Sequence, residues 1–292
     1  RIVLWMTVVM AVVNAISNYA LIFGNFGAPE LGVFGAAISS LVSNTLGLVI
    51  LVIYTQTKTA QYTLFQNFQR ADWDGLKQVF QLGWPIGLTH LSEVGLFAVA
   101  SIFMGWVGTI PLAAHGIALQ IASITFMIHL GLSQAITVRA GQAWGRRDAE
   151  LLTAASKAAL LLSGIAVAAT IALFLLLPEV LVGLFVDIND PDRASILAAG
   201  ATLLAVAALF QFVDAAQVMA RGMLRGVQDT RIPMIYAAIS YWVIGIPTSY
   251  VLGFVMGWDG VGVWLGLVVG LAVAGVLLQH RFWKRQVPAL VA

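Results

Sequence analysis

The sequence alternates between apolar segments of membrane-spanning length and short connections that carry nearly all of its charged residues. A helix needs about 20 mainly apolar residues to cross a bilayer, so each long charge-poor segment predicts one span. The charge-free segment at 94–138 is too long for one helix, and the sequence Gly108-Thr109-Ile110-Pro111 within it predicts a turn. The pattern predicts about eight spans, at approximately 2–24, 32–55, 79–107, 111–137, 158–177, 194–220, 232–257 and 260–280.

The positions of Lys and Arg predict how these spans are oriented. If Arg1 lies in the cytoplasm, eight alternating spans place every Lys and Arg except Arg193 on the cytoplasmic side, as the positive-inside rule requires. Arg193 ends the predicted external loop at 178–193, whose other charged residues are all acidic. The sequence therefore predicts a multi-pass protein of the inner (plasma) membrane, with both termini of this chain in the cytoplasm.

The composition excludes a water-soluble domain and several kinds of chemistry. Hydrophobic residues make up 60% of the chain and charged residues 10%, whereas a soluble domain carries about 25% charged residues. The chain has no Cys, which excludes disulfides and cysteine-ligated metal, and its net charge of +2 comes from dispersed basic residues rather than from a patch for nucleic acid. Since no nucleotide-binding loop, zinc motif or hydrolase motif occurs, we expect no enzyme activity, no cofactor and no use of ATP.

A weak internal repeat relates the first and seventh predicted spans. Residues 18–21 and 31–33 (NYAL and LGV) resemble 249–252 and 259–261 (SYVL and DGV). Because both copies begin on the cytoplasmic side and the second starts six spans after the first, the repeat predicts two parallel units of six helices. The chain would then hold the last two helices of the first unit and all of the second, with four helices preceding Arg1. A chance similarity between Gly- and Val-rich helices is the alternative.

Five motifs follow one another along the chain. They are NYALIFG (18–24) with PELG (29–32), PIG (85–87) followed by Glu93, AAH (113–115) through Gln120, GQAWGRRD (141–148), and RG (221–222) through RGVQDTRIPM (225–234). In these motifs and in their order, the sequence resembles the MATE family (multidrug and toxic compound extrusion), in particular its NorM-like branch. Gly116 departs from the family, which usually has Gln there. The resemblance implies an all-α membrane protein, the C-terminal part of a twelve-helix, two-lobe transporter.

The resemblance also implies a domain organisation. Residues 1–55 are expected to be the last two helices of the N-terminal lobe and 56–76 a cytoplasmic linker between the lobes. Residues 77–285 are expected to be the six-helix C-terminal lobe, and 286–292 a tail. The complete transporter is expected to be a monomer surrounded by membrane lipid.

Glu93 and Asp214 are the only acidic residues inside predicted spans. An acid near the bilayer centre costs about 2.5–3.5 kcal/mol on insertion scales, so it marks a wet cavity, a paired group or a protonated one. No Lys or Arg lies inside a predicted span to pair with either acid, which favours exchange of H⁺ or Na⁺. A neutral acid bonded between helices is the alternative. The resemblance implies the same role, because both positions match the acids that form the cation site in the C-terminal lobe of NorM-like transporters.

The predicted depths of these two acids conflict. Glu93 lies close to the middle of its predicted span, whereas Asp214 lies about 10 Å inward of the middle of its own. The two can meet only if the span at 194–220 begins later, or bends.

Six further residues are candidates for a polar or substrate-binding cavity around these acids. His90, Gln211 and Gln217 lie three residues from one of the acids and so share its helix face, although interhelical hydrogen bonds explain them equally well. Phe97 and Phe210 lie four residues from an acid and suit a lipophilic cation through cation–π attraction, with plain packing as the alternative. His115, near the start of the fourth span, is either a gate or a cap.

Together with these residues, the resemblance implies secondary active efflux, in which lipophilic, mostly cationic drugs or toxic organic cations leave the cell by antiport against H⁺ or Na⁺. Glu93 and Asp214 are the candidate Na⁺ ligands. The first alternative is a lipid-linked oligosaccharide flippase of the same superfamily, which would need basic residues in its cavity to hold a pyrophosphate; no predicted span contains one. The second alternative is an intramembrane enzyme, for which only Glu93 with His90 and His115 offers a candidate set.

Overall fold

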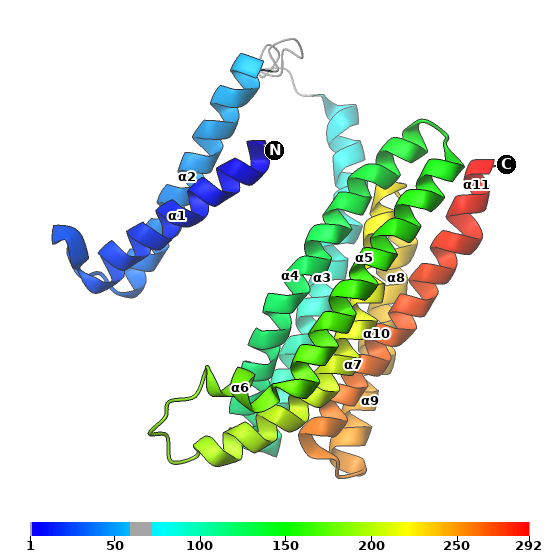
Figure 1. The fold of residues 1–292 in the computed structure, drawn as a ribbon. Helices are drawn as coiled ribbons and strands as arrows, with labels where there is room; N and C mark the ends of the chain where they lie inside the picture. Colours follow the sequence, from blue (N-terminus) through cyan, green and yellow to red (C-terminus); the bar gives the residue numbers. More distant parts are fainter. Residues whose placement is uncertain (1, 59–71, 292) are drawn as a thin grey trace. The chain divides into compact units, whose positions relative to one another are not determined.

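The computed structural model of this protein describes residues 2–58 and 72–291, which form helices and no strands. Eight helical segments of this described part are long and apolar enough to cross a membrane. The chain divides into two compact units, Arg1–Leu76 and Lys77–Ala292, each of which is described separately (Figure 1). The predictions of an all-α membrane protein and of about eight spans are confirmed.

The first unit is a pair of helices, α1 (Ile2–Phe23) and α2 (Val33–Lys58), joined by a turn that contains a short 3₁₀ helix (Asn25–Gly27). Leu31 N donates a hydrogen bond to the carbonyl oxygen of Leu21 at 2.8 Å. A Cβ atom on Gly35 would lie 2.4 Å from that oxygen. The two helices can therefore approach this closely only with a small residue at the contact, as in other membrane helix pairs.

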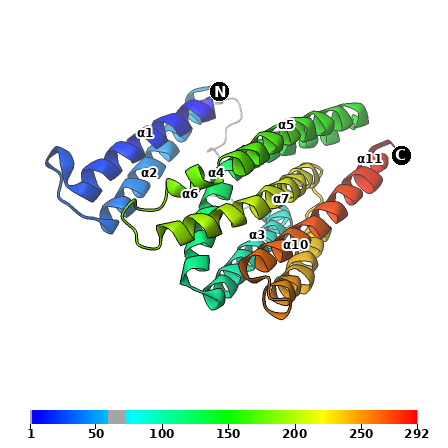
Figure 2. The ribbon, with the colours of Figure 1, turned by 60° about the horizontal axis from the view of Figure 1, so that its bottom comes forward.

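The second unit is a helical bundle built from α3 (Trp73–Val107, which begins just before the division), α4 (Thr109–Gly145), α5 (Ala149–Leu176), the short α6 (Pro178–Gly183), α7 (Arg193–Gly226) and two composite helices. The first composite helix consists of α8 (Arg231–Ala238), a π-helical segment (Ile239–Gly245), α9 (Ile246–Tyr250) and a second π-helical segment (Val251–Val255). The second consists of α10 (Asp259–Arg281), a π-helical segment (Phe282–Gln286) and α11 (Val287–Val291). Helix α7 packs against α4, α5 and α10 and so lies in the middle of the unit (Figure 2).

The two composite helices repeat the turn geometry of the first unit. Trp258 N donates to the carbonyl oxygen of Leu252 at 3.1 Å, and a Cβ atom on Gly262 would lie 2.5 Å from the same oxygen. A helix end, a returning backbone donor and a glycine thus meet in the same way in both helix pairs. The corresponding residues, Leu31 with Trp258 and Gly35 with Gly262, lie one position away from the pairing of Leu31 with Asp259 in the predicted repeat, which stays a prediction.

Several helices continue past the apolar segments that predicted them. Arg139 and Lys157, which were expected in cytoplasmic loops, lie on α4 and α5, and Arg221 and Arg225 lie on α7, which ends at Gly226 instead of 220. With 34 residues, α7 is about 51 Å long at 1.5 Å per residue. A helix of that length exceeds the hydrocarbon core of about 30 Å, so its charged end can extend into the headgroup region. Charge therefore did not mark the ends of these helices.

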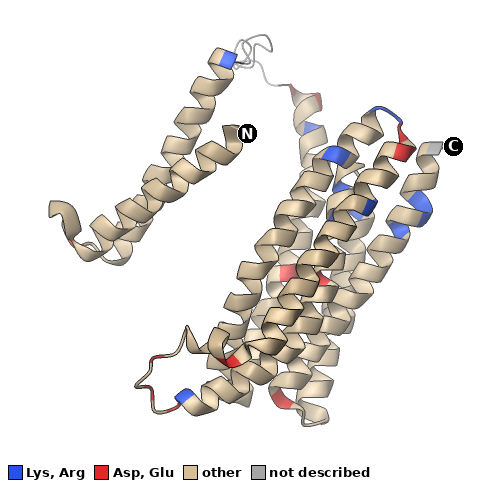
Figure 3. Ribbon diagram, viewed as in Figure 1, with Lys and Arg blue, Asp and Glu red and all other residues tan. Residues whose placement is uncertain are grey.

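The predicted turn at 108–111 is present, because α3 ends at Val107 and α4 begins at Thr109. Most of the linker predicted at 56–76 lies outside the described residues; its first three residues complete α2 and its last four begin α3. The predicted tail at 286–292 is helical as far as Val291. In the second unit, Lys and Arg gather at the end of the bundle where α11 ends (Figure 3).

Helices α4 and α7 cross through small residues and hydroxyl groups. Ser133 Oγ donates to the carbonyl oxygen of Val218 at 2.8 Å, and Thr137 Oγ1 donates to that of Gly222 at 2.9 Å. One turn further on, Gly226 leaves no room for a side chain. These contacts fix the rotation of α7 and thereby decide which of its residues face α3.

Replacing Gly226 by Ala is expected to lower the free energy of unfolding by about 1–3 kcal/mol, as overpacking commonly does. The added methyl group would lie 2.5 Å from Ala140 Cβ and 2.6 Å from the carbonyl oxygen of Thr137. Gly131→Ala in α4 is the matched control, because a Cβ atom there would meet nothing within 4 Å. Thermal unfolding in one detergent measures both variants, and equal midpoints would contradict the tight crossing.

Candidate functional site

A cavity of about 380 Å³ lies in the second unit between α3, α4 and α7. Both membrane acids face it, together with aromatic and aliphatic side chains. Its lining consists of Glu93, Val94, Phe97, Leu119, Ala122, Ser123, Phe126, Met127, Phe210 and Asp214. The structure therefore brings together four of the eight residues that the sequence predicted for the site.

Glu93 and Asp214 share this cavity, so the conflict between their predicted depths does not exist. Helix α7 extends to Gly226, which moves its middle toward Asp214 and leaves that residue about 7 Å from the middle. Both residues line the cavity between α3 and α7, and these two helices run in opposite directions (Figure 1).

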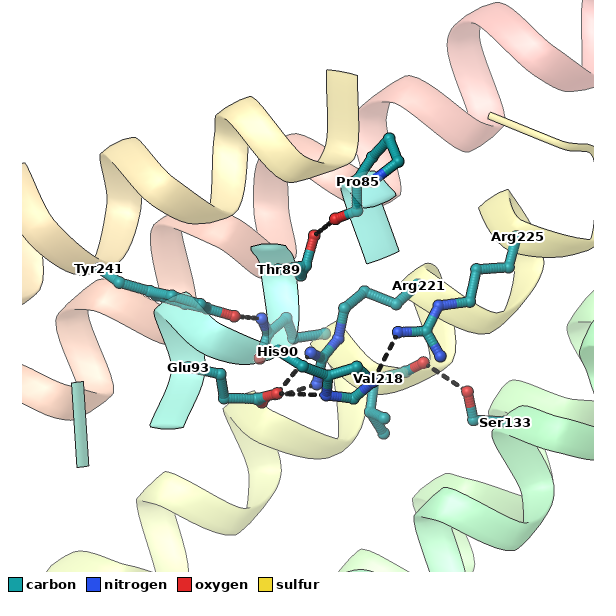
Figure 4. A network of polar contacts seen from close by, with 10 residues as sticks. Pro85, Thr89, His90, Glu93, Ser133, Val218, Arg221, Arg225 and Tyr241 are labelled. Atoms are coloured by element: carbon teal, nitrogen blue, oxygen red, sulfur yellow. Dashed lines mark hydrogen bonds and ion pairs between the residues drawn. The ribbon is translucent and has the colours of Figure 1, made fainter. Parts of the chain in front are cut away.

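Glu93 is paired with Arg221 of α7. Arg221 Nη1 donates to Glu93 Oε2 at 2.7 Å and Nη2 donates to Oε1 at 2.8 Å, which is the bidentate geometry of strong guanidinium–carboxylate pairs (Figure 4). The Arg221 side chain is 4% exposed and that of Glu93 is 13% exposed. The expectation that no basic residue lies inside a span to pair with Glu93 is therefore wrong, because α7 continues beyond the apolar segment that predicted it.

His90 lies beside this ion pair and outside the cavity lining. Its Nδ1 is 3.6 Å from Glu93 Oε2, and Arg225 Nη2 is 3.1 Å from its Nε2 (Figure 4). The His90 side chain is half exposed. The structure thus places His90 in a polar chain between Glu93 and Arg225.

Asp214 differs from Glu93 in having no such partner. It is 4% exposed, and its Oδ1 atom is buried without a hydrogen-bond partner among the described residues. A buried polar atom without a partner is costly and is uncommon in folded proteins. Of the two acids in the cavity, Asp214 is therefore the one with an oxygen free to hold a proton or a cation.

Aromatic rings support the cavity wall on the side of α7 and α10. Phe97 and Phe210 meet edge to face with ring centres 5.9 Å apart, and Phe210 meets Trp264 in the same way at 5.6 Å. Behind them, Trp264 Nε1 donates to His115 Nδ1 at 3.0 Å, and Ser101 Oγ lies 3.1 Å from His115 Nε2. His115 is buried and does not line the cavity. Its hydrogen bonds instead connect α4 to α3 through Ser101 and to α10 through Trp264.

The two glutamines join helices instead of lining the cavity. Gln211 Nε2 donates to the carbonyl oxygen of Ala122 at 3.1 Å and to Thr125 Oγ1, whereas Gln217 Nε2 donates to the hydroxyl oxygen of Tyr241. The Oε1 atom of each glutamine is buried without a partner among the described residues. These contacts fit the interhelical alternative that the sequence left open.

Sequence reasoning missed Arg221, Tyr241 and Trp264. The signal for Arg221 was its spacing, since it follows Asp214 by seven residues and such positions share one face of a helix. It was overlooked because a basic residue after an apolar segment was interpreted as the start of a loop. Nothing in the local sequence pairs Tyr241 with Gln217 or Trp264 with His115, because these partners are far apart in the chain.

Comparison with known proteins finds similarity to one family of membrane transporters in both sequence and fold. The MatE family model matches residues 85–251. Proteins of Agrobacterium fabrum and Rhizobium meliloti, both named "Probable multidrug resistance protein NorM", are 47% and 48% identical to this chain over 96% and 97% of its length. A solved structure described as an outward-facing multidrug resistance MATE family transporter has a TM-score of 0.84 at 22% identity and matches 98% of this chain.

The match is nearly complete for this chain and partial for its relatives. It covers 61% of each of the two relatives and 62% of the solved transporter. The chain therefore spans about three-fifths of the length of the relatives it matches. Its fold, its apolar helices and these similarities agree: the chain is a multi-pass membrane protein and belongs to the MATE family.

Proposed function

We propose that this chain is the C-terminal part of an ion-coupled multidrug exporter, in which entry of H⁺ or Na⁺ drives lipophilic, mostly cationic compounds out of the cell. The observation that carries this proposal is Asp214, a buried acid with an unpaired oxygen in a cavity whose other walls are mainly apolar and aromatic. An acid inside a membrane helix usually has a functional role, because the free-energy cost of burying it has to be offset by binding of a proton, a cation or a substrate.

The cavity suits a lipophilic cation. Its volume falls within the range of about 300–1,000 Å³ that is usual for small-molecule sites, and Phe97 and Phe210 offer ring faces beside the acids. Two carboxylates and the guanidinium of Arg221 leave one net negative charge when all three are ionised. One monovalent cation, either the coupling ion or the substrate, would neutralise these three groups, so that each competes with the other. The next charged group, Arg225, contacts His90 outside the cavity lining.

The domain organisation and the orientation are part of the proposal. Residues 1–55 would be the last two helices of an N-terminal lobe, 56–76 the linker, 77–285 the C-terminal lobe and 286–292 the tail. The gathering of Lys and Arg at the end of the second unit where the C-terminus lies (Figure 3) supports a cytoplasmic location for that end. With an even number of spans the N-terminus would lie on the same side, and the membrane would be the inner membrane. The complete protein would act as a monomer.

The coupling ion is H⁺ or Na⁺. Asp214 alone can carry a proton, whereas Na⁺ needs further oxygen ligands, and Glu93 is the candidate second ligand. Within the described ranges no group of three or more His, Asp or Glu side chains gathers to hold a metal ion. A Na⁺ site would therefore draw on these two carboxylates together with neutral oxygens.

The structure gives a different reason for disfavouring the alternative of a lipid-linked oligosaccharide flippase. A basic residue, Arg221, does lie within a membrane-length helix, but its charge is matched by Glu93 and it does not line the cavity. The lining is acidic and apolar, which disfavours a pyrophosphate. The intramembrane enzyme lacks its candidate set, because His115 bonds to Trp264 and Glu93 to Arg221.

Uptake of a cationic dye such as ethidium into everted membrane vesicles tests the proposal. Vesicles with the full-length gene product would receive either a pH gradient or a Na⁺ gradient, and we expect one of the two to drive accumulation above that of vesicles without the protein. The active gradient identifies the coupling ion. Equal accumulation in all vesicles would contradict the efflux function.

A further inference from the structure

Four polar groups on one face of α7 have unmet hydrogen bonds. They are three acceptors, Gln211 Oε1, Asp214 Oδ1 and Gln217 Oε1, and one donor, Arg221 Nε, all buried without a partner among the described residues. Residues three, four and seven positions apart lie on the same face of a helix. A donor that lacks an acceptor is thus placed on the same face as acceptors that lack a donor.

The guanidinium of Arg221 is placed to serve either acid. It points toward the N-terminus of α7, as long helical side chains do, and hence toward Gln217 and Asp214. It bonds to Glu93, and Asp214 lies seven positions earlier on the same helix face. A rotation away from Glu93 would turn its donors toward the unpaired oxygens of Gln217 and Asp214 on the same helix. Glu93 and Asp214 therefore compete for one buried cation that belongs to the protein.

We infer that Glu93 is a positioning residue that holds Arg221 away from Asp214, and that Arg221, once released, occupies Asp214 and excludes the coupling ion. This inference rests on the proposed function, in which Asp214 exchanges that ion. It assigns the two acids different tasks, in place of a Na⁺ site shared by both carboxylates: Asp214 binds the ion, and Glu93 keeps the site open.

The charges support this division of tasks. While Arg221 is bound to Glu93, the pair is neutral and Asp214 carries the remaining negative charge, so an external cation binds at Asp214. When Asp214 is empty, its charge attracts Arg221, and the pair that joins α3 to α7 is weakened. The other charged or titratable groups of this network are His90 and Arg225, which contact one another, and Tyr241, which contacts Gln217. Ion binding would thereby be linked to the contact between α3 and α7.

A rescue experiment in the full-length gene product tests the inference. Glu93→Gln should lower gradient-driven ethidium uptake more than about tenfold, because the freed arginine neutralises Asp214. The double variant Glu93→Gln/Arg221→Gln should return uptake to within about threefold of wild type, since removal of both partners of a buried pair is well tolerated. The matched control is Glu93→Gln/Arg225→Gln, which removes a charge one helical turn away and should not rescue.

Failure of rescue would overturn the inference. If the double variant is folded and as inactive as Glu93→Gln, then Glu93 binds the ion directly. Thermal unfolding of the purified proteins reports folding, and Glu93→Gln/Arg221→Met provides the same comparison if the first double variant is poorly folded. Wild-type uptake tests the proposed function separately: its absence would contradict efflux, whereas its presence without rescue contradicts only the role given to Arg221.

Discussion

Gradient-driven dye uptake is expected to be lost when Asp214 is replaced by Asn in the full-length gene product. The amide has the shape of the carboxyl group but cannot release a proton, and it carries no charge to hold Na⁺. We expect a reduction of at least about a hundredfold in transport, as for loss of a group that acts only in the coupled step. The protein should remain folded, because Asp214 Oδ1 makes no hydrogen bond that would be lost.

Two controls make the Asp214→Asn result specific. Asp190→Asn removes a carboxylate from the loop between α6 and α7, outside the cavity lining, and should leave uptake unchanged. Ethidium binding to the purified Asp214→Asn protein, measured by fluorescence polarisation, separates loss of coupling from loss of the substrate cavity. Uptake at the wild-type rate in the Asn variant would show that ion coupling does not depend on Asp214 and would remove the basis of the proposed site.

Trp264→Ala is expected to cause the largest loss of stability. Trp264 is fully buried on α10, its ring meets those of Phe210 and His115, and its Nε1 donates to His115. Truncation of a buried Trp lowers the free energy of unfolding by about 3–5 kcal/mol, because it removes packing and leaves a cavity. Here it would also leave His115 Nδ1 without its donor and Phe210 without support behind the cavity wall.

Equilibrium unfolding in mixed detergent micelles measures this effect. Trp258→Ala is the matched control, because the Trp258 side chain is 46% exposed; we expect its free energy of unfolding to change by less than about 1 kcal/mol. If the free energy of unfolding falls equally in both variants, the loss does not depend on burial of the tryptophan. That result would contradict the support of the cavity wall by Trp264. A Trp264→Phe variant, which keeps a ring but not the hydrogen bond, separates packing from hydrogen bonding.

The number and type of the membrane helices followed from local properties of the sequence. Apolar segments of spanning length predicted all eight helices, and Gly108 with Pro111 predicted the turn between α3 and α4. These predictions succeeded because a segment's insertion into lipid depends mainly on its own residues. The ends of the helices were less well predicted, since a helix can continue into the headgroup region, where charge is not excluded.

The interaction partners of Glu93 and Asp214 could not be predicted from local properties of the sequence. Arg221 was expected outside the membrane, yet it lies within α7 and pairs with Glu93, which is 128 residues away in the chain. That pairing depends on how far α7 continues, on its rotation against α4 at Gly222 and Gly226, and on its opposite direction to α3. None of these three features is encoded in a short stretch of sequence.

The sequence by itself determined that this protein is helical, crosses the membrane about eight times and carries two acids at membrane depth. It did so because hydrophobicity and charge act residue by residue in lipid. Only the tertiary structure decided that the two acids are unequal, with Glu93 neutralised by Arg221 and Asp214 left with a free oxygen. The physical reason is that a buried charge is matched by a group from another helix, and the packing of the whole bundle selects that group.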